Sequence, residues 1–273
     1  MSSAPEPVVQ NVPSLLKPLP PELWPNIDHI QTEDGAPVDN VFSEKQMRLL
    51  TESLHSSWKP DFPFVAFANV GLFYGVNIAP LVPAVLLSLN VRLPEDLRPK
   101  LNRSYFVWGY GKPPEVVIEI VSNKEGREDT EKLDLYADVR VSNYFIYDPD
   151  GFLSDTPLRG YELVRDELKP LEEDRFLLPK SELGLCLWRG RYEDTDATWL
   201  RWTDPQWNLI PTGAEKAEAE ASRAEAEASR ADAEASRADG EASRAEAEAA
   251  AARAVQQENE RLQKILRDHG IDS

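Results

Sequence analysis

The sequence predicts an α/β fold, with a mixed β-sheet flanked by helices and a long helix toward its C-terminal end. Three observations predict it. Residues 114–149 have the pattern of a strand, a helix and a second strand, later segments have the pattern of antiparallel strands, and residues 214–268 repeat an alanine-rich heptad. The 273 residues suffice for one core of ordinary size plus appendages. We divide the chain into a Pro-rich tail (1–26), a body (27–213) and a heptad-repeat segment (214–273).

The first strand of segment 114–149 contains one acidic residue among apolar ones. Val116 to Val121 is a run typical of a strand buried on both faces, and Glu119 lies within it. Alternation places Val117, Glu119 and Val121 on one face. Burying an ionised carboxylate is costly unless it is paired. Glu119 is therefore either a structural residue, satisfied by an Arg or by backbone donors, or a metal-binding carboxylate on a rigid strand.

A short amphipathic helix follows this strand. Leu133 and Tyr136, three residues apart, face the core, and Lys132 lies one turn before Tyr136. The lysine either extends to solvent or reaches Glu119 across the junction between strand and helix. The second strand, 143–147, stops at a DPDG turn, which completes a strand–helix–strand unit with a parallel pair of strands.

Other elements have weaker patterns. A helix capped by Ser43, with Gln46 at the capping-box position, precedes a hairpin over 64–74 and a strand over 82–89. Antiparallel strands are expected at 161–164, 183–188 and 199–202.

The order EIVSN, EGxE, KLxLY and YFIYDP within residues 114–149 resembles the Uma-two family of restriction-endonuclease-like proteins, a branch of the PD-(D/E)XK nuclease superfamily. The resemblance covers about residues 27 to 216. It continues upstream through FSEKQMRLLTESL, NVGLFYG, PLVPAVLLSL and RSYFVWGYGKPPEVV, and downstream through LGLCLWRGRYED, TWLRW and LIPTGAE. It implies a restriction-endonuclease-like mixed sheet flanked by helices, with a metal-dependent phosphodiesterase site.

The resemblance also implies site residues. Glu119 matches the family's second acidic ligand and Lys132 its basic residue, and the backbone carbonyl of Ile120 is the expected third ligand of Mg²⁺ or Mn²⁺. The family's first ligand is the Asp of a Pro-Asp pair, but this chain has Pro83-Ala84. Because alanine cannot ligate a metal, we expect weak or absent ion binding. The chain is then a naturally inactive relative, a protein inactivated at Ala84, or one in which a neighbour supplies the ligand.

The charge of the chain disfavours broad nucleic-acid binding. Its net charge is −18; residues from Ala214 onward contain 15 acidic and 9 basic residues, a net of −6, which leaves −12 for residues 1–213. If DNA binds, we expect it at the loop that carries the nearest basic residues, although an ordinary solvated loop has the same composition. These residues, interleaved with Tyr105 and Trp108, are Arg92, Arg98, Lys100 and Arg103. A single cysteine and the lack of a leader or membrane-spanning run favour a cytoplasmic location.

The segment from Ala214 predicts a long helix. The heptad AEAEASR begins at Ala217 and recurs with small changes, so its first and fifth positions form the alanine seam of a coiled coil. Such a seam buries little area, which leaves a single solvated helix as the alternative to a homodimer or higher assembly. The more apolar end, before a stop at Gly270, contains Val255, Leu262, Ile265 and Leu266.

Two functions from different classes follow. One is a Mg²⁺-dependent DNA endonuclease, inactive or impaired because Ala84 replaces a ligand, with Glu119 and Lys132 in its site. The other is a non-catalytic interaction protein that uses the nuclease-like fold as a platform and the C-terminal helix for assembly. The residue at position 84 distinguishes the two functions, because a competent ion site should not carry an alanine there.

Overall fold

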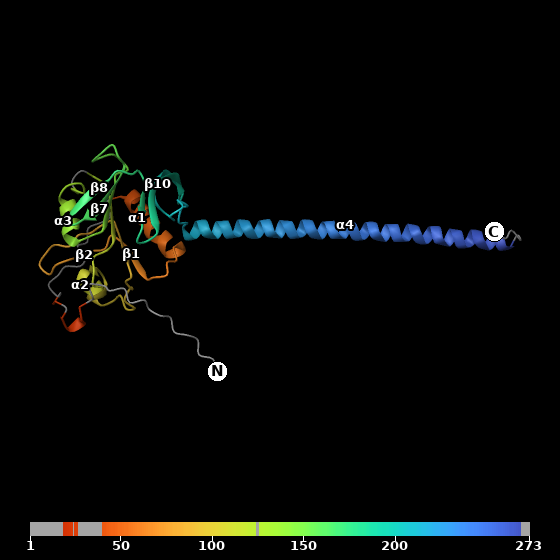
Figure 1. Ribbon diagram of the computed structural model, residues 1–273, viewed down its shortest axis with the longest axis horizontal. Coiled ribbons are helices and arrows are strands. Elements are labelled where there is room, and N and C mark those ends of the chain that lie inside the picture. Colours follow the sequence, from red (N-terminus) through yellow and green to blue (C-terminus); the bar gives the residue numbers. More distant parts are fainter. Residues whose placement is uncertain (1–18, 24, 27–39, 124–125, 269–273) are drawn as a thin grey trace. The chain divides into compact units, whose positions relative to one another are not determined.

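The computed structural model describes residues 19–23, 25–26, 40–123 and 126–268, and it divides the chain into two units, residues 1–213 and 214–273 (Figure 1). The unit 1–213 has a mixed sheet and flanking helices, so the predicted α/β class is confirmed. The elements in chain order are η1 (Pro21–Leu23), α1 (Val41–Ser57), β1 (Phe64–Ala68), β2 (Leu72–Phe73), β3 (Val85–Leu89), η2 (Lys100–Asn102), β4 (Tyr105–Phe106), α2 (Val107–Tyr110), β5 (Val116–Ile120), α3 (Glu131–Val139), β6 (Asn143–Tyr147), β7 (Leu158–Val164), β8 (Glu167–Leu171), β9 (Phe176–Leu178), β10 (Leu183–Tyr192), β11 (Thr195–Thr203) and α4 (Gly213–Asp268).

The main sheet has six strands in the order β1-β3-β5-β6-β7-β8. Strands β5 and β6 pair in parallel, with Glu119 opposite Ile146, and the other neighbouring pairs are antiparallel. This confirms the predicted strand–helix–strand unit. The segments predicted as antiparallel strands lie within β7, β10 and β11, of which β10 and β11 join β9 in a separate three-stranded sheet.

The hairpin predicted over residues 64–74 is wrong. Strand β1 pairs with β3, and the two-residue β2 pairs in parallel with β4. Strand β3 is buried at all five positions, so it gives β1 a longer apolar partner than β2 can. It begins at Val85 rather than at residue 82, since Pro83 has no N–H to donate to a ladder.

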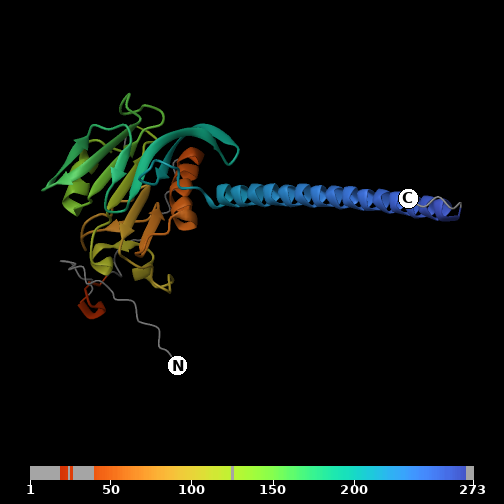
Figure 2. The ribbon, with the colours of Figure 1, turned by 45° about the vertical axis from the view of Figure 1, so that its right-hand side comes forward.

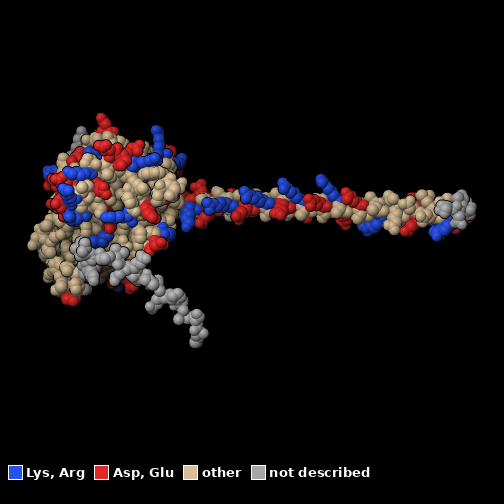
Figure 3. All heavy atoms as spheres, viewed as in Figure 1, with Lys and Arg blue, Asp and Glu red and all other residues tan. Residues whose placement is uncertain are grey.

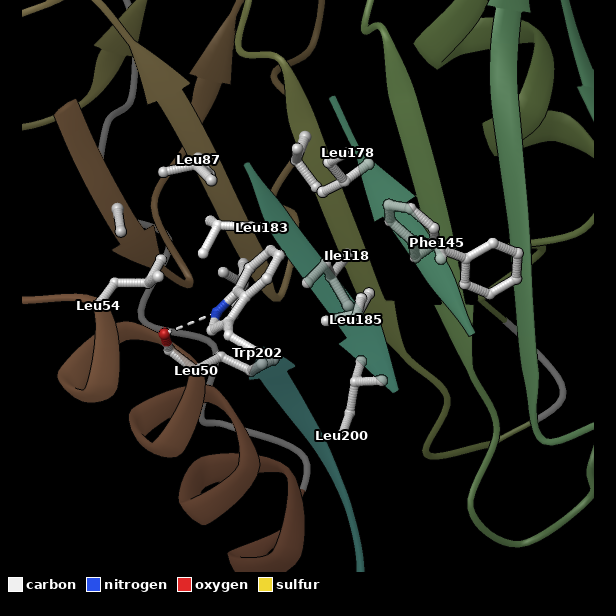
Figure 4. Packing of buried hydrophobic residues seen from close by; sticks show 14 of the residues in the cluster. Leu50, Leu54, Leu87, Ile118, Phe145, Leu178, Leu183, Leu185, Leu200 and Trp202 are labelled. Carbon is white, nitrogen blue, oxygen red and sulfur yellow. Dashed lines mark hydrogen bonds between the residues drawn. The ribbon is translucent and has the colours of Figure 1, made fainter. Parts of the chain in front are cut away.

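Both faces of the main sheet are covered (Figure 2). On one face, Val116, Ile118 and Ile120 of β5 pack with residues of α1 and of the β9–β11 sheet; on the other, Val117 packs with Tyr136 of α3. The predicted alternation along β5 is therefore confirmed. In the first cluster the indole N–H of Trp202 donates to the carbonyl of Leu50 at 2.9 Å, which ties β11 to α1 (Figure 4).

The N-cap of helix α1 lies three residues before the predicted cap. Its N-cap is Asn40, whose Oδ1 accepts the N–H of Ser43 at 2.8 Å, so the predicted roles of Ser43 and Gln46 in a capping box are wrong. Asn caps a helix as well as Ser does. Gln46 is fully buried instead: its Nε2 donates to the carbonyl of Leu200, and its Oε1 accepts the Leu200 N–H, both at 2.9 Å. Gln46 thus satisfies the backbone of β11, the edge strand of the second sheet.

The predicted long helix is α4, with 56 residues. None of its residues is buried within the chain, and basic and acidic side chains alternate along it (Figure 3). The exposed large apolar residues near its end are Val255, Leu262, Ile265 and Leu266. Gly270 and most of the tail 1–26 lie outside the described residues. Among the described helices, none combines the length and apolar character that crossing a membrane requires.

Replacing Gln46 with Leu should lower the free energy of unfolding by about 2–4 kcal/mol, because it leaves two buried backbone groups of Leu200 without partners. Urea denaturation measures the loss. The control is Arg48→Gln, which removes exposed ion pairs on the same helix and should cost at most about 1 kcal/mol. Equal losses in the two variants would contradict the contact.

Candidate functional site

Glu119 lies on β5, inside the main sheet, and is 4% exposed. Its Oε1 accepts a hydrogen bond from the Tyr136 hydroxyl at 2.6 Å and lies 3.2 Å from Nζ of Lys132. Of the two alternatives for Lys132, the contact with Glu119 is therefore the one that the fold adopts. The carboxylate is satisfied by a lysine and a tyrosine of α3, not by an arginine.

A second buried carboxylate, which sequence reasoning missed, reaches the same lysine. Glu128 lies in the turn before α3, and its Oε1 is 3.3 Å from Nζ of Lys132. Glu128, Lys132 and Tyr136 are spaced four residues apart, and this spacing aligns side chains along one side of a helix. That spacing was the available signal. It was hidden because Glu128 precedes the first helical residue and Tyr136 was interpreted only as core.

The surroundings hold the Glu128 carboxylate in place. The hydroxyl of Tyr144 donates to the Glu128 carbonyl at 2.9 Å. A Cβ on Gly126 would lie 1.8 Å from Oε1 of Glu128, so the glycine leaves the space that this carboxylate fills. Glu128 is 6% exposed, and its Oε2 is buried without a hydrogen-bond partner in the described structure. Its second oxygen is thus buried and unsatisfied within the part of the chain that the structure describes.

Burial and charge shape the acid–base behaviour of this cluster. Burial raises the pKa of Glu119, and the Lys132 ammonium and the Tyr136 hydroxyl oppose that rise only in part. Burial lowers the pKa of Lys132, but the attraction of Glu119 and Glu128 outweighs it, so the pKa is raised. Burial also raises the pKa of Tyr136 well above its usual value. At neutral pH, Lys132 is therefore a cation and Tyr136 a hydrogen-bond donor.

A second cation lies on the same face of the sheet. Arg159 of β7 is opposite Ile146 of β6, which is itself opposite Glu119. Its Nη1 lies 3.2 Å from Oδ2 of Asp129, while its Nε and Nη2 are buried without hydrogen-bond partners among the described residues. Lysine and arginine thus line one side of the site.

Ala84 lies in the bend just before β3. Val85 is opposite Ile118, so continuing this register by one residue sets Ala84 opposite Glu119. The Ala84 side chain is half-buried and packs against the first cluster, whereas Glu119 is on the face of the second. A carboxylate at position 84 can therefore reach Glu119 only if the bend before β3 directs it around the end of the strand to the other face of the sheet. The role of Ala84 as the site of a lost ligand stays a prediction.

The remaining predicted residues lie away from this cluster or stay untested. Ile120 ends β5, and the ligand role of its carbonyl stays a prediction. In the basic loop, Arg98 pairs with Asp96, and Arg103 donates to the carbonyl of Arg98 at 2.9 Å. Tyr105 is fully buried and cannot stack on a base. DNA binding at Arg92, Arg98, Lys100 and Arg103 stays a prediction.

The cluster fits a divalent ion, but only weakly. Mg²⁺ in proteins is held by one or two carboxylates and several waters. Glu119 and Glu128 supply two carboxylates, one with a buried oxygen that has no partner. Over the described ranges, no group of three or more His, Cys, Asp and Glu side chains is arranged to hold a metal ion. The ammonium of Lys132 lies between the two carboxylates, so a divalent ion would have to compete with it.

Replacing Lys132 with Met should cost on the order of 3 kcal/mol of unfolding free energy, because it leaves two buried carboxylates without a cation. Glu119→Gln should cost much less. Since the pKa of Glu119 is raised, its ionised form opposes folding above that pKa, and a neutral amide removes this term. Chemical denaturation at neutral pH compares the two variants. Equal and small losses would show that the lysine and the carboxylate do not stabilise each other.

Comparison with known proteins identifies the family to which the chain belongs. The profile of the Uma2 family, described as "Putative restriction endonuclease", matches residues 36–172, half of the chain. One similar solved structure is a putative nuclease belonging to DUF820 from Anabaena variabilis ATCC 29413, with 18% identity over 55% of this chain and 75% of that chain and a TM-score of 0.37. No curated protein matches. The family match includes Glu119, Glu128 and Lys132, and on this basis the chain belongs to the Uma2 family of restriction-endonuclease-like proteins.

Proposed function

We propose that the body of the chain is a restriction-endonuclease-like phosphodiesterase for DNA, impaired because Ala84 leaves its divalent-ion site one carboxylate short. The observation that carries this proposal is the buried contact between Glu119 and Lys132 inside the sheet of an Uma2 protein. A cation and a carboxylate held together on a rigid strand and helix are the two kinds of group that phosphodiester hydrolysis requires.

Each side chain has a part in this chemistry. Glu119 and the carbonyl of Ile120 would hold Mg²⁺ or Mn²⁺, which when bound polarises a phosphate and lowers the pKa of a bound water. Lys132, cationic at neutral pH, stabilises negative charge as it develops on the phosphate. The Tyr136 hydroxyl fixes the orientation of the Glu119 carboxylate. The buried face around these groups excludes water and strengthens their interactions.

Electrostatics limits the substrates of such a site. The net charge of −12 on residues 1–213 repels DNA at long range. Binding must then rely on local cations, such as Lys132 and Arg159 at the site and the loop from Arg92 to Arg103. We therefore expect weak, strongly salt-dependent DNA binding confined to a narrow class of substrates.

Replacing Ala84 with Asp, whose carboxylate the bend before β3 must turn toward Glu119, should increase both Mn²⁺ binding and ion-dependent cleavage of DNA, each by about tenfold or more, because affinity for hard cations follows the number of anionic oxygens. Titration calorimetry and cleavage of single- and double-stranded DNA measure the two effects. The control is Ala84→Asp with Glu119→Gln, which should lose the gain.

Two results would contradict the assignment of position 84. One is an Ala84→Asp protein with neither ion binding nor cleavage above those of the parent. The other is a parent that is already fully active.

A second candidate is a non-catalytic protein that assembles through α4. The observation that favours it is a 56-residue helix with no residue buried within the chain and with four large apolar side chains exposed near its end. Isolated helices gain little from intrinsic propensity alone, and an apolar seam is stable mainly when another helix covers it. A second copy of α4 provides a matching seam, with acidic and basic side chains beside it.

Truncation after Gly213 should leave the melting midpoint of the body unchanged, because its core clusters lie entirely within residues 1–213. It should also lower the oligomer size or the hydrodynamic radius measured by light scattering. A dimer that persists through the body alone is compatible with this. A truncated protein that unfolds, or one with unchanged mass and shape per chain length, would argue against assembly through α4.

A further inference from the structure

We infer that Glu128, in the turn before α3, supplies a carboxylate to the divalent-ion site in addition to Glu119 and to the position that Ala84 leaves without a ligand. The inference rests on the proposed function and assigns a residue to it. Glu119 and Glu128 would together hold the ion; their Oε1 atoms lie 3.2 and 3.3 Å from the Lys132 ammonium.

The balance of charge supports a second cation. Among the described residues, Glu119 and Glu128 share one ammonium, which leaves one negative charge in excess in a buried cluster. The neighbouring Arg159 is engaged with Asp129. Buried charges are retained when they are paired or bind metals, and an unpaired one is costly. An ion with two positive charges would neutralise both carboxylates and release the lysine for the substrate.

The local structure is built around the Glu128 carboxylate. Gly126 leaves room for it, Tyr144 holds the backbone of Glu128, and Oε2 is buried without a hydrogen-bond partner in the described residues. A buried oxygen without a donor is suited to a cation.

An ion would reach the two carboxylates from the side on which Lys132 lies. Its side chain is 25% exposed, whereas those of Glu119 and Glu128 are 6% and 8% exposed. The lysine is therefore the solvent-facing member of the cluster and can swing outward from between the carboxylates. Removing its ammonium should expose a ready two-carboxylate site, and this makes the inference testable without any assay of cleavage.

The experiment titrates full-length variants with Mn²⁺ and follows binding by electron paramagnetic resonance and the melting midpoint by circular dichroism. Lys132→Met should bind Mn²⁺ about tenfold more tightly than the parent, since the competing ammonium is gone, and its midpoint should rise as Mn²⁺ is added. Adding Glu128→Gln should remove both effects. The matched control adds Glu131→Gln, an exposed glutamate of the same helix that pairs with Arg127, and should keep both effects.

A second variant displaces the carboxylate without removing it. Adding Gly126→Ala to Lys132→Met should weaken Mn²⁺ binding as Glu128→Gln does, because the new Cβ occupies the position of the Glu128 oxygens, which lie at the end of a flexible side chain. If Lys132→Met does not fold, the same comparison is made between the parent and Glu128→Gln at millimolar Mn²⁺.

Mn²⁺ binding that is equally tight with and without Glu128 would overturn the inference, even if Ala84→Asp cleaves DNA. Absence of cleavage by every variant would count against the proposed function and leave a Glu128-dependent ion site standing. Parent and Lys132→Met proteins that both fail to bind Mn²⁺ would overturn the ion site itself.

Discussion

Glu119 lies inside the sheet, where an ionised carboxylate needs a partner, and much of the body is arranged to supply it. The partners are Lys132 and Tyr136, both on α3, so this helix must lie across the face of the sheet that carries Glu119. The parallel pairing of β5 with β6 follows from the same crossover. A helix shifted by one residue would turn Lys132 and Tyr136 away together. The ion pair and the packing of α3 are therefore one constraint.

The buried acids of the body differ in how they are satisfied. Asp148 follows β6 and accepts N–H groups from Phe152, Leu153 and Ser154 at 2.7 to 3.1 Å, so its charge is met by the backbone of one loop. This is a structural role. Glu128 is also buried, but over the described ranges one of its oxygens has no hydrogen-bond partner, and it shares the Lys132 ammonium with Glu119. Because Asp148 is fully satisfied and Glu128 is not, we infer that the part of the core around Lys132 is not optimised for stability alone.

Sequence patterns over short segments predicted the features that depend on interactions within those segments. The strand–helix–strand unit, the face of Glu119 and the length of α4 could be predicted from spacing and composition, whereas the contact of Glu119 with Lys132 was one of two alternatives. The pairing of β1 with β3 could not be predicted, because β1 pairs with β3 and not with β2, the strand that follows it directly in the sequence. Glu128 was missed for a related reason: its burial depends on a tyrosine of β6 and a glycine in the preceding turn, which no periodic pattern encodes.

The alanine at position 84 is consistent with a cluster that must fold without an ion. With Glu119, Glu128 and one ammonium, the metal-free site already carries an excess negative charge. A third carboxylate turned into this site would raise that excess and would be stable only while a divalent ion was bound. Ala84 instead packs against the apolar cluster, and under the proposed function it would stabilise the metal-free fold and weaken the ion site. Under the proposed function, stability and activity would be opposed at this position, as they often are where charge must be concentrated for chemistry.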